Sequence, residues 1–325
     1  MAQTLLEYAE WLEGRDDLIW PKPPELERPK ATPFTKPLPG IRAVTWNVYG
    51  TLLHISDGQL LLMHPQELRM QVALEKTIEE FHMWQSMSRK PGAPWEYMLI
   101  QYKRLVEDAE MAGTDRPGDF PHVDAARIWR KLIERLLENE YSYDESFYGD
   151  LDEFSVKVAF FFHSALQGVE PMPDALETMT AATGAGLKQG LLSDSQSFTV
   201  VQMLRALRRQ GTLPPLDQLL TPNCATLSHE EGVRQPSKSL YAACLRRFRD
   251  LGIEPHEILH VGSRLQDDLA MAKQFGMKTV LFAGDKESLQ ATAQEVKDPA
   301  MKPDRLITEL AQLRQILGIP EKGEF

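Results

Sequence analysis

The sequence predicts an α/β fold in which helices cover a parallel sheet and a block of helices is inserted after the first strand. Three observations support this prediction. Residues 41–46 (IRAVTW) form a short β-prone run that leads into a turn at Gly50. Residues 64–167 then show only the helical period, and after Gly168 strands alternate with helices. Such alternation is typical of a parallel sheet with helices on both faces.

The first 40 residues differ from the rest of the chain and are expected to form a helix followed by an extended arm. Apolar residues at helical spacing predict a helix over residues 3–13. A dense set of prolines follows: Pro21, Pro23, Pro24, Pro29, Pro33, Pro37 and Pro39. Prolines at this density favour a polyproline-like segment. We expect the arm to lie along the domain surface, anchored by Trp20 and Phe34. The alternative is a recognition segment for a groove on a protein partner.

Four amphipathic helices are predicted in the inserted block, which we place at residues 54–167. Each has apolar residues three and four positions apart. The helices are expected around residues 70–81, 98–109, 128–136 and 151–166. Asp124 is a suitable N-cap for the third of them. Four such helices without strands predict a helical bundle that forms a module of its own.

After the block the sheet resumes, so we assign residues 41–53 and 168–325 to one α/β core. The predicted strands are residues 187–192, 219–220, 258–261 and 278–282. The predicted helices are residues 198–208, 236–248, 266–275 and 303–317. Because the first strand has no crossover helix before the block ends, the block is an insertion into this core.

Composition and charge exclude several classes of function. The chain has 325 residues, with 36 Lys and Arg against 47 Asp and Glu, and a formal net charge of −11. This balance argues against a nucleic-acid partner and against binding to an anionic membrane surface. No segment is long and apolar enough to span a membrane, and the first residues lack the basic region of a secretory signal. Only Cys224 and Cys244 are present, so we predict no disulfide framework and expect a cytoplasmic protein.

Polar residues follow the predicted strands, at the sheet edge where α/β proteins bind ligands. They are Asn47, Tyr49 and Thr51; Ser193 and Asp194; Gln235 with Tyr241; and Ser263 with Asp267 and Asp268. In order, spacing and strand context, these four groups resemble the four motifs of the haloacid dehalogenase superfamily of hydrolases. The inserted helices resemble the first-type cap of that superfamily, on a Rossmann-like core. The resemblance covers about residues 41–317.

The resemblance implies a covalent mechanism. A carboxylate at position 47 would attack the substrate, and water would then hydrolyse the resulting ester or acyl phosphate. Thr51 and Ser193 stand where the family hydrogen-bonds the nucleophile or the transferred group. A Lys at position 235 would hold the nucleophile and offset developing negative charge.

Four other positions bear on the branch of the family. Tyr49 stands where phosphatases carry Asp and dehalogenases carry Tyr. Ser263 stands where phosphatases carry a magnesium-binding Asp and dehalogenases commonly carry Ser. Tyr241 matches a Tyr of the dehalogenases, and Asp268 matches the last acidic residue of the family. These matches imply a chain similar to the dehalogenase branch.

Three departures weaken the implied chemistry. Position 47 is Asn, which is a far poorer nucleophile than a carboxylate, and position 235 is Gln, which carries no charge. Position 194 is Asp where the family usually has Asn. Asn47 and Gln235 can share a hydrogen bond without either charge, so we infer that these two positions lost their charges jointly. Lys238, three residues after Gln235, is an alternative source of positive charge.

The departures lead to two main hypotheses about function. The first is a hydrolase-fold protein whose covalent chemistry is impaired and which acts as a binding or interaction protein. The alternative is an active hydrolase for small phosphate or halo-acid substrates, in which Asp194 or Asp268 activates water. An ordinary hydrolase would require deamidation of Asn47. For metal, Asn47, Asp267 and Asp268 offer at most a weak magnesium site, so we expect no cofactor.

Overall fold

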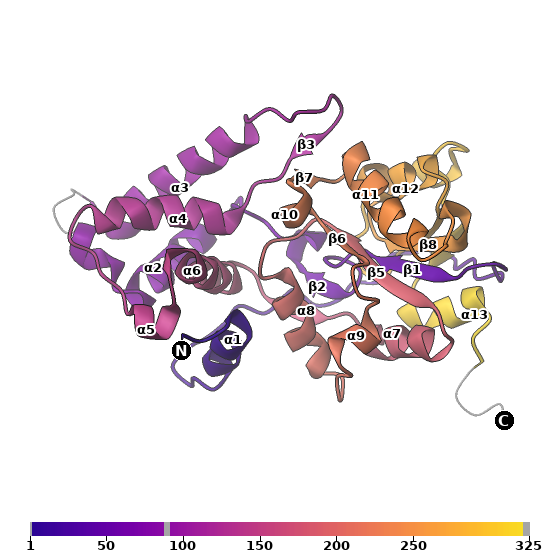
Figure 1. Ribbon diagram of the computed structural model, residues 1–325, viewed down its shortest axis with the longest axis horizontal. Coiled ribbons are helices and arrows are strands. Elements are labelled where there is room, and N and C mark those ends of the chain that lie inside the picture. Colours follow the sequence, from indigo (N-terminus) through magenta and orange to yellow (C-terminus); the bar gives the residue numbers. More distant parts are fainter. Residues whose placement is uncertain (1, 88–91, 321–325) are drawn as a thin grey trace.

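A six-stranded parallel sheet forms the centre of the core (Figure 1). The computed structural model describes residues 2–87 and 92–320. The strand order is β10-β9-β8-β1-β5-β6. The strands are β1 (Ala43–Trp46), β5 (Lys188–Ser193), β6 (Ala225–Leu227), β8 (Ile258–Gly262), β9 (Lys278–Phe282) and β10 (Arg305–Ile307). Because β1 pairs with both β5 and β8, the carboxyl ends of these three strands meet at the middle of one sheet edge.

Helices cover both faces of this sheet. On one face, α7 (Ala175–Gly184), α8 (Thr199–Arg208) and α13 (Leu313–Leu317) share an apolar cluster with Val44 and Trp46 of β1. On the other face, α11 (Lys238–Arg249) and α12 (Ala270–Gln274) share a cluster with Ala43 of β1. Short helices α9 (Leu216–Leu219) and α10 (Ser228–Glu231) complete the core. The predicted α/β class is therefore confirmed.

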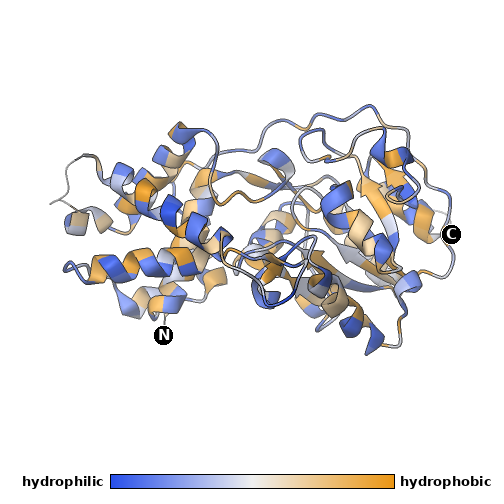
Figure 2. Cartoon of the chain, turned by 90° about the horizontal axis from the view of Figure 1, so that it is seen from above, coloured by the Kyte–Doolittle hydropathy of each residue, from blue (hydrophilic) through white to orange (hydrophobic). Residues whose placement is uncertain are grey.

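The inserted helices form a cap beside the core (Figure 1). They are α2 (Glu67–Glu80), α3 (Pro94–Glu110), α4 (Ala125–Leu137), α5 (Glu145–Tyr148) and α6 (Leu151–Leu166). Figure 2 shows apolar residues along the strands and on the inward sides of many helices. Asp124 accepts from the backbone N–H groups of residues 126 and 127, which confirms the predicted N-cap. None of the helices in the described ranges is long and apolar enough to cross a membrane.

Two small antiparallel sheets lie where the chain passes between cap and core. Strand β2 (Leu53–Ile55) pairs with β4 (Val169–Pro171), so the two linkers run side by side. Strand β3 (Phe120–Pro121), which comes from the cap, pairs with β7 (Val233–Arg234) of the core. We keep residues 54–167 as our proposal for the extent of the cap.

The N-terminal segment follows the surface of the chain. Helix α1 (Leu5–Glu13) begins with a capping box between Thr4 and Glu7. The arm then bonds to the rest of the chain through its backbone, for example from Phe34 N to Leu306 O at 2.8 Å and from Leu38 N to Ile316 O at 2.8 Å. These contacts favour the surface arm over a segment held free for a protein partner.

Several predicted elements were wrong. Residues 219–220 are not a strand, because the short helix α9 ends at Leu219. The strand that lies next to β5 is β6 instead. Residues 303–317 do not form one helix, because residues 305–307 pair with β9 as β10. The two missed strands of the central sheet, β6 and β10, have three residues each, too few to show a period of two. The helix predicted at 266–275 begins with a π-helical turn, Leu265–Leu269, and α7 was not predicted.

Candidate functional site

The carboxyl ends of β8, β1 and β5 bring the polar groups of the sequence together. Asn47 follows β1, Ser193 ends β5 and Ser263 follows β8. Gln235 reaches the same place from the loop between β7 and α11. These four side chains are no more than 1% exposed. The site is therefore a buried polar cluster, in which each group depends on protein partners for its hydrogen bonds.

Three side chains fix the orientation of the Asn47 amide. Its Nδ2 donates to Asp268 Oδ2 at 2.9 Å and to Gln235 Oε1 at 3.3 Å. Its Oδ1 accepts from Ser193 Oγ at 3.0 Å. Because Nδ2 faces a carboxylate oxygen and a carbonyl oxygen, a donor is required on that side of position 47. In this arrangement an amide fits and a carboxylate does not.

Asp268 is the buried acceptor around which the site is built. Its Oδ1 accepts from Gln235 Nε2 at 2.6 Å and from Tyr241 OH at 3.0 Å, and lies 2.7 Å from His260 Nε2. Its Oδ2 accepts from Asn47. Burial raises the pKa of Asp268, but His260 and its other polar neighbours outweigh burial and hold the pKa below the ordinary value. Asp268 is thus an ionised carboxylate whose two oxygens hold other side chains.

Arg264 supplies a cation that the sequence analysis did not identify. Its guanidinium lies 3.0 Å from Asp194 Oδ2 and also donates to Gln235 Oε1. Its side chain is only 8% exposed. Burial disfavours the charged form, but Asp194 and Asp268 outweigh this and raise the pKa of Arg264. Lys238, the expected alternative, is exposed instead. Beside its uncharged amides the site therefore keeps one carboxylate–guanidinium pair.

His260 was missed as well, although its strand was predicted. It is a polar residue within the apolar strand β8 and is fully buried. Its Nδ1 lies 2.9 Å from Thr45 Oγ1, while Nε2 faces Asp268. The positions of His260 and Arg264 in the sequence could have identified both as site residues. His260 interrupts an apolar strand, and Arg264 directly follows Ser263 at the strand end.

Tyr49, Thr51 and Ser263 are predicted site residues that make no hydrogen bond to the amide of Asn47 or to Asp268. The Tyr49 hydroxyl lies 2.9 Å from Thr199 Oγ1 and donates to Gln202 Oε1 at 2.7 Å, so it is engaged with α8. Burial raises the pKa of Tyr49. The hydroxyls of Thr51 and Ser263 are buried, and neither has a hydrogen-bond partner within residues 2–87 and 92–320. The role that the resemblance implies for Thr51, bonding to position 47, has no counterpart in these contacts.

The turn after β1 requires glycine at position 50. Its φ is +75°, and a Cβ there would lie 2.7 Å from Gly58 O and 2.8 Å from Ser263 Oγ. A side chain would therefore meet backbone that cannot move away. This close approach holds the loop after Asn47 against residue 58, at the entrance to the cap.

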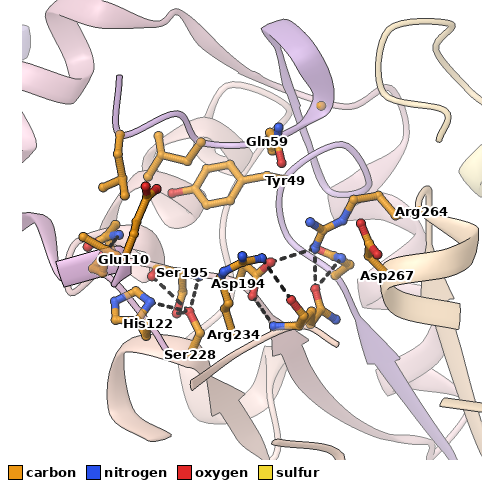
Figure 3. Close-up of a pocket in the computed structure, with 17 residues that line it drawn as sticks. Tyr49, Gln59, Glu110, His122, Asp194, Ser195, Ser228, Arg234, Arg264 and Asp267 are labelled. Carbon is orange, nitrogen blue, oxygen red and sulfur yellow. Dashed lines mark hydrogen bonds and ion pairs between the residues drawn. The ribbon is translucent and has the colours of Figure 1, made fainter. Parts of the chain in front are cut away.

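A pocket of about 200 Å³ lies between this cluster and the cap (Figure 3). The core lines it with Asn47, Tyr49, Asp194, Ser195, Gln196, Ser228, Arg234, Gln235, Arg264 and Asp267. The cap and its linker add Gly58, Gln59, Leu60, Leu62, Glu110, His122 and Val123. Burial lowers the pKa of His122 to about 4, so this residue is neutral at pH 7. The walls suit a small polar molecule.

The residues at the site do not fit a magnesium ion. Magnesium requires free, hard oxygen ligands in an octahedron. Both oxygens of Asp268 already accept hydrogen bonds, and Asn47 turns its NH₂ group toward that carboxylate. Arg264 places a positive charge beside them. Asp267 is exposed and lines the pocket with Asp194, which pairs with Arg264, and with Glu110. No group of three metal-binding side chains that could hold an ion occurs among the described residues.

We therefore expect millimolar magnesium to change the melting temperature by less than about 1 °C. A ligand stabilises a fold only when its concentration exceeds the dissociation constant. Differential scanning fluorimetry with magnesium and with EDTA measures the shift. A rise of several degrees that is lost in Asp267→Asn would contradict this expectation and place the ion at the exposed carboxylate.

Comparisons with known proteins agree with the fold of the core. The family model described as haloacid dehalogenase-like hydrolase matches residues 41–276. A glyceraldehyde 3-phosphate phosphatase of Pyrococcus furiosus is 31% identical over 216 residues, which are 66% of this chain and 75% of that protein. A ribulose-1,5-bisphosphate 5-phosphatase of Halopiger xanaduensis is 26% identical over 49% of this chain and 61% of its own length. The structure of a 2-haloacid dehalogenase from Pseudomonas syringae pv. Tomato DC3000 is similar in fold, with a TM-score of 0.52 and 20% identity, over 86% of this chain and 98% of that one.

Proposed function

The chain belongs to the haloacid dehalogenase-like hydrolases, and from this premise we propose that it binds a small anionic molecule without forming the covalent intermediate of the family. The orientation of Asn47 carries this proposal. Its Nδ2 donates to Asp268 and Gln235, so position 47 presents no carboxylate oxygen to a substrate. The buried carboxylate of Asp268 is held by four side chains and cannot turn to attack. The site therefore lacks an available nucleophile at the family position.

The ligand class that we propose is a small phosphate ester. Two arginines, Arg234 and Arg264, are among the residues that line the pocket, and guanidinium groups bind phosphate well. The relatives with phosphatase names support the same class. A volume of about 200 Å³ is below the roughly 300–1,000 Å³ of drug-sized sites, which favours a molecule of few heavy atoms.

A second candidate function is hydrolysis with Asp194 as the base that activates water. The observation that favours it is the exposure of this carboxylate, since 29% of its side chain is accessible while it pairs with Arg264 in the pocket. Water bonded to Asp194 would attack the bound ester directly, and the leaving alcohol would take up a proton. The retained pair of Asp194 and Arg264 would then replace the charge pair that is missing at positions 47 and 235.

Wild-type protein is expected to release no phosphate or halide above background, because position 47 lacks the anionic nucleophile. The measurement is a phosphate and halide assay on phosphate monoesters and 2-haloacids, beside isothermal titration calorimetry with the same compounds. Binding without turnover supports the leading proposal. Turnover that is lost in Asp194→Asn and kept in Asp217→Asn, an exposed Asp on α9 outside the pocket, would establish the second candidate instead.

We also propose that the protein acts in the cytoplasm. Cys224 and Cys244 are both free and buried, and burial raises the pKa of each thiol. Unpaired thiols are the rule in reducing compartments.

A further inference from the structure

Helix α1 lies where the cap meets the core and contacts helices of both (Figure 1). On the cap side, Tyr8, Ala9 and Leu12 are no more than 1% exposed and belong to the apolar cluster of the cap helices. The ring of Tyr8 packs edge-on against Phe160 of α6, with 6.5 Å between the ring centres. Buried area of this kind binds α1 firmly to the cap.

On the core side, two acidic residues of α1 pair with arginines of α8. Glu13 Oε1 lies 2.8 Å from a guanidinium nitrogen of Arg205, and Glu10 pairs with Arg208. The guanidinium of Arg205 also lies 5.3 Å from the centre of the Phe160 ring. The side chain of Arg205 is 14% exposed. One core residue thus contacts both α1 and the cap, which strengthens its ion pair relative to a fully exposed one.

The segment after α1 then crosses both linkers between cap and core. Trp20 packs against Phe161 of α6, with ring centres 5.2 Å apart. The carbonyl oxygen of Pro24 lies 2.7 Å from Nε2 of His54, which belongs to the linker strand β2. A Cβ on Gly168, beside the other linker strand, would lie 2.4 Å from a carbonyl oxygen of the arm. The arm therefore lies directly against the two chain segments about which a cap would turn.

From these contacts we propose that residues 2–38 act as a clasp that fixes the orientation of the cap on the core. The clasp is bound to the cap by burial, to α8 by ion pairs and to β10 by backbone bonds. Elsewhere on the boundary, β3 of the cap pairs with β7 of the core. When α1 is released from α8, that sheet and the hydrogen bonds of Gln196 in the core with Val123 and Ala125 in the cap still join the two parts and form a pivot. Because Glu110 and His122 of the cap line the pocket, rotation of the cap changes the shape of the pocket.

The test measures the distance between cap and core in the full chain. Spin labels are placed on exposed cysteines introduced by Glu138→Cys in the cap and Asp250→Cys in the core, while the two native cysteines are buried. The clasp is released by Glu10→Arg/Glu13→Arg, two exposed positions whose side chains are 44% and 42% accessible. Reversal of two surface ion pairs corresponds to about a two- to thirtyfold change in the population of a second distance.

We expect one narrow distribution of distances between the two labels when Glu10 and Glu13 are intact. After Glu10→Arg/Glu13→Arg we expect a second, populated distance. Adding Arg205→Glu/Arg208→Glu to the reversed chain restores opposite charges and is expected to remove the second distance. The matched control is Arg130→Ala, which breaks ion pairs that lie only within the cap. Identical distances before and after reversal, or the same change in the control, would overturn the proposal. Circular dichroism confirms that each variant is folded.

Discussion

Substitution of Asp268 by Asn is expected to lower the free energy of unfolding by about 3–5 kcal/mol at pH 7. The carboxylate takes hydrogen bonds from Asn47, Gln235 and Tyr241 and contacts His260, with none of its surface exposed. An amide at this position turns an NH₂ group toward donors and leaves at least one of them buried without an acceptor. Urea unfolding followed by circular dichroism measures the difference.

The neighbouring Asp267 provides a matched control for Asp268→Asn. Asp267 is exposed, so Asp267→Asn is expected to change stability by no more than about 0.5 kcal/mol. The pH dependence gives a second check. The folded state depresses the pKa of Asp268. The contribution of its carboxylate to the free energy of unfolding is therefore complete above the pKa of the unfolded chain, about 3.9, and is lost as pH falls through the pKa of the folded state. Equal effects of the two substitutions would show that Asp268 does not hold the site together.

Asn47→Asp is expected to destabilise the chain by about 2–3 kcal/mol at pH 7, which is high for a single isosteric change. The introduced carboxylate replaces a donor that now lies 2.9 Å from Asp268 Oδ2 and 3.3 Å from Gln235 Oε1. Two like charges this close, in a buried site, raise the pKa of the introduced group. The destabilisation by the introduced Asp is therefore absent below the pKa of the unfolded chain, about 3.9. It grows as pH rises from that value through the raised pKa of the folded state. Unfolding titrations of wild type and variant across this range measure the cost.

The double variant Asn47→Asp/Gln235→Lys tests whether positions 47 and 235 interact. Gln235 Nε2 lies 2.6 Å from Asp268 Oδ1, so an ammonium there faces that carboxylate and the introduced one. We expect a favourable coupling of about 0.5–3 kcal/mol in the double-mutant cycle. Because Arg264 contacts Gln235 Oε1, the new cation also meets a like charge, and the double variant does not recover full stability. A coupling near zero would contradict the contact between the two positions.

Patterned, apolar segments made most of the fold predictable from the sequence. The strands at 41–46, 187–192, 258–261 and 278–282 were placed correctly, since each is a run of β-prone residues that becomes fully or largely buried. Strand β10 was missed because its three residues are too few to show a strand pattern, and its pairing with β9 is a tertiary contact that the local sequence does not reveal. Helices α2, α3, α4 and α6 of the cap were predictable because each carries its own apolar stripe. Helix α5 was missed because it has only four residues and buries none of them.

The site was predictable in position but not in its contacts. Strand ends locate Asn47, Ser193 and Ser263 at one edge, because parallel strands deliver their carboxyl ends to the same place. Sequence alone could not show that Asp268 is occupied by four neighbours, since hydrogen bonds depend on side-chain conformations fixed by tertiary packing. The same limit hid Arg264, whose guanidinium reaches across to residues 70 and 29 positions away in the chain.

During synthesis on a ribosome, the arm emerges long before the residues that hold it. Arg28 pairs with Glu309, 281 positions later, and Phe34 bonds to Leu306 of the last strand. Contacts so distant in sequence form slowly, because a long loop has to close first. The cap helices can meanwhile gather around their own apolar cluster, whereas the sheet lacks β10 until residues 305–307 have been made. Until then the proline-rich segment lacks these partners and is open to chaperones and proteases, and its docking marks the point at which the sheet has gained β10.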